Sequence, residues 1–115
     1  MSSNYKEEIK RWRYQIDKLD RDLVRLLNER TECAIQIGRI KAESGIAVYD
    51  PEREEEVAQN VRTSTHGPMS RVAVQRIFER IIDETRRTER EDRKRIASKN
   101  AVDLKSESTL KDVKP

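Results

Sequence analysis

Two cations interrupt the apolar face of the first predicted helix. Arg30 occupies an apolar position, Lys41 follows eleven residues later on nearly the same face, and neither has an acidic residue three or four positions away. An unpaired buried charge costs several kcal/mol, so each cation must find an anion or stay near water. For either cation alone, pairing across the bundle with Glu54 or another acid is the simpler explanation. Together, about 16 Å apart along one helix, they could instead converge on a small anion with two carboxylates.

Arg13 is a third cation, and its spacing leaves its role open. It shares a heptad column with Lys41 but precedes it by 28 residues, which is about 42 Å along a straight helix. The two side chains cannot serve one site within one helix. Arg13 either pairs locally with Asp17 or reaches the site of an antiparallel partner chain.

The apolar face of the last predicted helix continues into two polar residues, Thr85 and Glu89. A helical Thr can bond back to its own backbone, and Glu89 is placed to pair with Arg93 four residues later. Glu54, near the start of the middle helix, suits the positive end of the helix dipole. Each of these residues therefore has a structural role that competes with a functional one.

A long helix has to position the three cations. Apolar residues recur at alternating spacings of three and four, which predicts one helix over about residues 6–43. Gly38 costs about 1 kcal/mol relative to Ala in a helix interior, so it marks a place where another group packs close to the backbone. The apolar repeat, interrupted at Arg30, consists of Ile9, Trp12, Ile16, Leu19, Leu23, Leu26, Cys33, Ile37 and Ile40.

Two further helices follow in the sequence. Asp50 suits an N-cap and Pro51 the first helical position, so the second helix begins there and ends before a break at residues 63–68. The third is predicted from about residue 70 and continues past Thr85 as a charged rod. Residues 98–115 are expected to be disordered. We therefore expect one domain over residues 1–90, followed over residues 91–115 by a charged helix extension and a disordered tail.

Composition limits the class of protein. Charged residues make up 41% and hydrophobic residues 34% of the 115 residues, a balance that favours one all-α domain of solvated helices. Residues 86–115 hold ten Lys or Arg and six Asp or Glu, so the formal charge of +3 lies in the tail. Acidic residues interrupt that basic run and no aromatic residue lies within it, so a solvated helix end is expected and nucleic acid is an unlikely partner. Cys33 and His66 are each the single residue of their kind, so we expect no intramolecular disulfide and no metal site. The N-terminus has no apolar signal region and no apolar run is long enough to span a bilayer, so we expect a cytoplasmic location.

The length of the first helix predicts association. A helix of this length extends about 57 Å, farther than the two later helices can cover within one protomer. Its apolar stripe needs another chain, and a homodimer is the simplest solution.

These features resemble the all-helical (type II) chorismate mutases. The resemblance covers about residues 8–89, and its order and spacing are more specific than any one motif. It implies a metal-free and cofactor-free rearrangement of chorismate to prephenate in phenylalanine and tyrosine biosynthesis, by an intertwined homodimer with three helices per protomer. The motifs are Arg13 to Asp20, Leu26 to Arg30, Ile37 to Lys41, Asp50 to Glu54 and Ile77 to Ile82.

The resemblance also implies roles for eight residues. Arg30 and Lys41 would hold the substrate carboxylates, Lys41 also reaching the ether oxygen, and Arg13 would come from the other protomer. Thr85 would offer a hydroxyl to a carboxylate and Glu89 would contact the ether oxygen opposite Lys41. The residues expected around the ring hydroxyl are Asp50, Arg53 and Glu54.

Two positions depart from the pattern of better-known members. Thr85 stands where Ser is common, and Glu89 stands where Gln is common, so Glu89 must be protonated to donate a hydrogen bond. An isochorismate pyruvate lyase on the same fold is the nearest alternative, although the acidic segment from Asp50 to Glu54 is more similar to the mutases. The other alternative is a non-catalytic helical interaction or regulatory module that kept the fold, such as one segment of a bifunctional shikimate-pathway chain.

Overall fold

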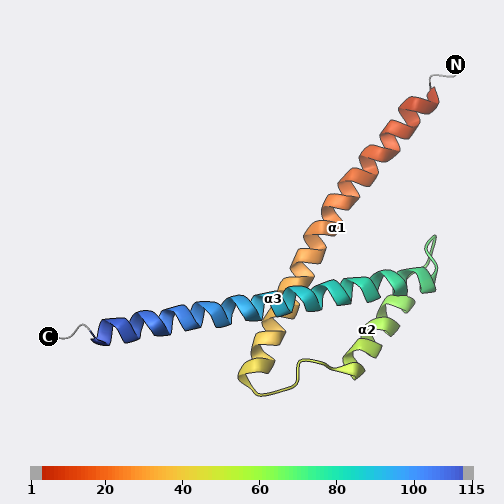
Figure 1. The fold of residues 1–115 in the computed structure, drawn as a ribbon. Helices are drawn as coiled ribbons and strands as arrows, with labels where there is room; N and C mark the ends of the chain where they lie inside the picture. The colour runs from red at the N-terminus through yellow and green to blue at the C-terminus, as the bar shows by residue number, and fades with distance from the viewer. Residues whose placement is uncertain (1–3, 113–115) are drawn as a thin grey trace. The chain divides into compact units, whose positions relative to one another are not determined.

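The computed structural model consists of three α-helices, α1 (Asn4–Glu43), α2 (Pro51–Ser64) and α3 (Arg71–Asp112) (Figure 1). It describes the backbone of residues 4–112 and the side chains of residues 4–105. No strand occurs in this described part, which confirms the all-α prediction. The first helix begins and ends within two residues of its predicted bounds. The chain divides into two compact units, residues 1–33 and residues 34–115, which we describe separately.

The first unit is the N-terminal part of α1, and its apolar stripe is exposed in the protomer. Trp12 is 69% exposed and Leu19 is 59% exposed, and Ile9, Ile16, Leu23 and Leu26 are exposed as well. A helix gains most of its stability in a protein from packing an apolar face. This stripe therefore still requires a covering surface, as the sequence predicted, while the homodimer itself stays a prediction.

In the second unit α2 packs along the N-terminal half of α3. Asp50 accepts a hydrogen bond from the Arg53 backbone N–H at 3.2 Å, which caps α2 as expected. Ser70 accepts one from the Ala73 backbone N–H at 3.1 Å and caps α3 in the same way. Val57 and Ala58 of α2 lie opposite Phe78 and Ile82 of α3, and these side chains are only half-buried.

The most buried residues are polar. Among residues 4–105 no apolar side chain is buried, whereas Gly38, Thr85 and Asp92 are, with Thr85 7% and Asp92 6% exposed. Gly38 lies in the last part of α1, and the Glu89 carboxylate of α3 comes within 3.7 Å of where a Cβ of Gly38 would be. The predicted close approach to the backbone at Gly38 is confirmed, and the approaching group is a carboxylate.

The third helix is longer than predicted. It continues to Asp112, so residues 98–112, where disorder was expected, are helical. Ala97, Ala101 and Leu104 favour a helix, and neither Gly nor Pro interrupts this segment. Residues 113–115 of the expected tail lie outside the described residues, and the division of the chain at residue 90 stays a prediction.

Along the residues that the structure describes, no helix is long and apolar enough to cross a membrane.

Gly38→Ala is expected to raise the melting temperature. Ala is favoured over Gly in a helix by about 1 kcal/mol, and the added methyl group would meet the Glu89 carboxylate at an ordinary contact distance of 3.7 Å. Thermal unfolding followed by circular dichroism, at one fixed protein concentration, measures the change. Gly45→Ala is the control, because Gly45 has a φ of 68° and Ala would be strained there. A lower melting temperature for Gly38→Ala would contradict the 3.7 Å separation, because the methyl group would then collide with Glu89.

Candidate active site

The acidic segment at the start of α2 is exposed and partly used by local interactions. Asp50 accepts the capping bond from the Arg53 backbone, and the Arg53 side chain pairs with Glu56 at 3.1 Å. Because a carboxylate can accept several hydrogen bonds, the cap leaves Asp50 with capacity for a ligand. The capping role predicted for Asp50 is therefore confirmed, and its ligand role is compatible with it.

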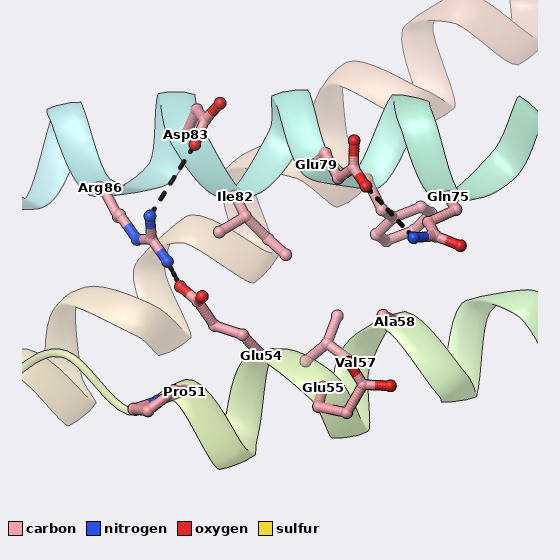
Figure 2. Close-up of a pocket in the computed structure, with 11 residues that line it drawn as sticks. Pro51, Glu54, Glu55, Val57, Ala58, Gln75, Glu79, Ile82, Asp83 and Arg86 are labelled. Carbon is pink, nitrogen blue, oxygen red and sulfur yellow. Dashed lines mark hydrogen bonds and ion pairs between the residues drawn. The ribbon is translucent and has the colours of Figure 1, made fainter. Parts of the chain in front are cut away.

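Glu54 points from α2 toward α3, where its carboxylate forms an ion pair with Arg86 (Figure 2). The Arg86 guanidinium also lies over the Tyr49 ring, 5.6 Å from its centroid, and 3.9 Å from the Asp83 carboxylate. Three groups thus hold one guanidinium. The expectation that Arg86 belongs to a solvated basic run is wrong, because it follows Ile82 by one helical turn and so shares the face of α3 that packs on α2.

A pocket opens between α2 and α3 beside this ion pair (Figure 2). Apolar atoms of Val57, Ala58 and Ile82 line it, together with the acidic side chains of Glu55 and Glu79. Of the predicted site residues only Glu54 lines it. It is therefore not the place where the predicted cations and polar groups converge.

Lys41 lies in the last turn of α1 and is half-buried. Its Nζ donates to the Val48 carbonyl oxygen at 3.4 Å, which links the helix end to the connection before α2. It forms no ion pair with any residue that the structure describes. An ammonium carries three donors, so Lys41 retains donors and an uncompensated positive charge for a ligand.

Glu89 is more than a surface residue. Its side chain is 14% exposed, and Arg93 Nη1 lies 3.9 Å from its carboxylate. The predicted pair with Arg93 is present but long, and Arg93 Nη1 is buried with no hydrogen bond to any residue that the structure describes. The simple explanation of Glu89 as an exposed partner of Arg93 therefore does not account for its burial.

Thr85 lies one turn before Glu89 on the same face of α3. Its Oγ1 donates to the Ile81 carbonyl oxygen at 2.7 Å, which is the local backbone bond expected of a helical Thr. A hydroxyl group can accept a hydrogen bond while it donates one, and it can rotate to donate elsewhere, so this bond is compatible with the role predicted for Thr85.

Arg13 and Arg30 belong to the first unit, Arg13 exposed and Arg30 half-buried. No ion pair joins Arg13 to Asp17, although the structure describes both residues, so the local alternative for Arg13 is not seen. The second unit holds the other six predicted site residues. They are Lys41, Asp50, Arg53, Glu54, Thr85 and Glu89.

Comparison with known proteins identifies the family. Residues 12–90 match the family of chorismate mutases of type II, which is more than half of the chain. The chain belongs to this family. The match begins one residue before Arg13 and ends one residue after Glu89, so it contains all eight predicted site residues.

Solved structures and relatives agree with this family. The chorismate mutase (Form II) from Thermus thermophilus superposes with a TM-score of 0.70 and 31% identity, covering 72% of this chain and 94% of that one. A bifunctional chorismate mutase/prephenate dehydratase from Neisseria gonorrhoeae is 37% identical over 90 residues, 78% of this chain and 24% of the relative. A chorismate mutase from Methanocaldococcus jannaschii is 34% identical over 56 residues, 49% of this chain and 57% of that protein. This chain therefore spans about a quarter of the bifunctional relative.

Asp92 is a buried charge that the motifs did not single out, and it lies just past the part of the chain that matches the chorismate mutase family. Its carboxylate accepts hydrogen bonds from Arg39 Nη2 at 3.0 Å and Arg39 Nε at 3.3 Å, and from Arg95 Nη2 at 2.7 Å. The hydrogen bond from Arg39 lowers the pKa of Asp92, against the opposing effect of burial, and Arg95 lowers it further. The sequence signal was its spacing, because Asp92 follows Thr85 by seven residues on one face of α3.

Within the residues that the structure describes, no three His, Cys, Asp or Glu side chains are grouped so that they could hold a metal ion.

Proposed function

We propose that the protein is a chorismate mutase that converts chorismate to prephenate as a homodimer. One observation carries the proposal: the chain covers 94% of the Thermus thermophilus chorismate mutase. It covers only 24% of the Neisseria gonorrhoeae relative, which is named for both a chorismate mutase and a prephenate dehydratase. The part of the chain that matches known proteins is therefore about as long as the Thermus thermophilus chorismate mutase and much shorter than the bifunctional relative.

The reaction suits a site made of charges and hydrogen-bond donors. In this rearrangement a carbon–oxygen bond breaks while a carbon–carbon bond forms within one molecule, so no nucleophile is needed. The protein must hold a flexible dianion in the compact shape that brings the two carbons together. Preorganised donors must also meet the negative charge that develops on the ether oxygen.

Lys41 is the group best suited to that oxygen. Its ammonium is half-buried and bonded only weakly, at 3.4 Å, to a backbone carbonyl. In the proposed site Lys41 contacts a substrate carboxylate and the ether oxygen. Arg30 and the partner protomer's Arg13 bind the carboxylates, and Thr85 adds a hydroxyl.

The ring hydroxyl of the substrate is assigned to the start of α2. Arg86 engages one oxygen of the Glu54 carboxylate, which holds the side chain in place and leaves its other oxygen to accept the substrate hydroxyl. Asp50 and Arg53 line the same corner. Arg86 thus orients Glu54 and prevents an uncompensated negative charge beside a dianionic substrate.

The homodimer follows from the exposed stripe of α1. Large apolar side chains repeat along this helix and remain exposed in the protomer, among them Trp12, Leu19 and Leu23. A stripe that repeats every three and four residues is the pattern that packs against another helix. In the proposed dimer the partner's α1 covers it and brings Arg13 to the site.

Arg30→Ala and Lys41→Ala are each expected to lower kcat/KM for chorismate by at least about 100-fold, the scale of losing a donor to developing charge. Chorismate consumption is followed by absorbance and the product is identified by chromatography. Arg87→Ala, at an exposed position of α3, should retain wild-type activity. Prephenate as the wild-type product supports the proposal. Pyruvate release from isochorismate would assign the lyase activity instead, and a folded protein inert toward both substrates would indicate a regulatory module.

Mixing Arg13→Ala with Lys41→Ala is expected to restore activity that neither variant has alone. A mixed dimer holds one site with both wild-type groups, so random exchange should recover about a quarter of the wild-type rate. The mixture is assayed after unfolding and joint refolding, and native mass spectrometry of differently tagged chains proves the exchange. Mixed dimers without recovered activity would show that Arg13 and Lys41 do not serve a shared site.

Glu89→Gln is expected to preserve or raise kcat/KM at neutral pH. An ionised carboxylate cannot donate a hydrogen bond to the ether oxygen, whereas an amide can. The measurement compares kcat/KM at neutral pH for the wild type, Glu89→Gln and Glu89→Ala, which removes the polar group altogether and should lose activity. Wild-type activity in Glu89→Ala would remove Glu89 from the mechanism.

A further inference from the structure

The middle of α3 has no apolar side chain with which to pack. Residues 83–95, which separate Ile82 from Ile96, are all charged or Thr. Helices normally fix their relative position by fitting apolar ridges into grooves. Residues 83–95 have no apolar side chains to form such ridges. Yet this segment contains Glu89, which must face α1 at one particular place. Polar contacts therefore have to determine which turn of α3 meets which turn of α1.

The Arg39–Asp92 ion pair has the properties of such a contact. The two residues are 53 positions apart in the sequence, and two guanidinium nitrogens of Arg39 bond to the two oxygens of Asp92. A two-point contact of this kind fixes orientation as well as distance. The Asp92 side chain is 5% exposed, so it would be costly to bury without this partner. Arg95 donates to the same carboxylate at 2.7 Å.

This ion pair lies next to the contact that places Glu89. Arg39 directly follows Gly38, and Asp92 follows Glu89 by three residues, about 4.5 Å along α3. The Glu89 carboxylate meets α1 at Gly38. A shift of α3 by one turn, about 5.4 Å, would have two effects at once. It would break the hydrogen bonds between Arg39 and Asp92, and it would move Glu89 away from Gly38.

We propose that Asp92 and Arg39 are positioning residues, whose ion pair sets the register of α3 on α1 and so places Glu89 for the reaction. This inference rests on the proposed function. Neither residue contacts the substrate in the proposed site, and Asp92 lies past residue 90, where the match to the family ends. The ion pair acts through Glu89, so its effect on catalysis requires that Glu89 be present.

The test compares Asp92→Ala and Arg39→Ala in the wild-type and Glu89→Ala backgrounds. In the wild-type background each variant should lower kcat by about 10- to 100-fold with KM changed less than kcat, because misplacing a group by about 1 Å has effects of this size. In the Glu89→Ala background the further loss should be below about twofold, since coupled residues are not additive. The double variant of Asp92 and Arg39 should resemble either single variant.

Matched controls separate positioning from folding. Glu91→Gln alters the exposed acid beside Asp92 and should leave kcat unchanged. Circular dichroism and size-exclusion chromatography report whether each variant folds and associates as the wild type does. Should Asp92→Ala fail to fold, Asp92→Asn and Arg39→Lys remain, because each keeps part of the contact and should lower kcat by less than the Ala variants.

Each outcome decides one question. A wild-type protein without chorismate turnover would overturn the proposed function. An active wild type with an unchanged kcat in the Asp92 and Arg39 variants would overturn this inference alone. So would a Glu89→Ala variant with wild-type kcat, or an equal loss in both backgrounds, because the ion pair would then not act through Glu89.

Discussion

The protomer has no buried apolar side chain among its described residues, and this constraint governs the rest of the molecule. Burial of apolar surface is the main favourable term in folding, so α1 must gain it from outside the protomer. The surface available for that purpose carries Arg13 and Arg30. In the proposed dimer, association therefore completes the apolar packing and the binding site together, and folding stability depends on protein concentration.

The contact between the end of α1 and α3 is made by polar residues. In the proposed function this region holds a dianion, which needs polar groups around it that an apolar interface would not provide. The chain places Gly38 where α3 approaches, and it buries Thr85 and Asp92 on the facing side. Most buried polar groups in proteins are hydrogen-bonded, and the bonds from Arg39 and Arg95 do this for Asp92.

The elements were predictable from the sequence because their signals are local. The three-and-four spacing located α1, Asp50 and Pro51 located the start of α2, and Gly38 indicated a close approach. The Arg39–Asp92 pairing was not predictable in the same way, because six Lys or Arg residues lie between positions 86 and 95 and any of them is a possible partner for an acid. Tertiary contact decides among them. The helical end of α3 was missed because a charged, weakly apolar sequence is compatible with both a solvated helix and disorder.

The distribution of paired charges in the second unit is compatible with the anionic substrate of the proposed function. Glu54 has Arg86, and Asp92 has Arg39 and Arg95, so each of these two acids is balanced by an arginine of the same chain. Lys41 has no carboxylate partner among the described residues and bonds only to a carbonyl oxygen. The acids consequently contribute little net negative charge, while the cation at the end of α1 keeps its own. In the proposed function, a positive charge beside neutralised carboxylates would attract the dianion and favour a transition state in which negative charge moves onto one oxygen.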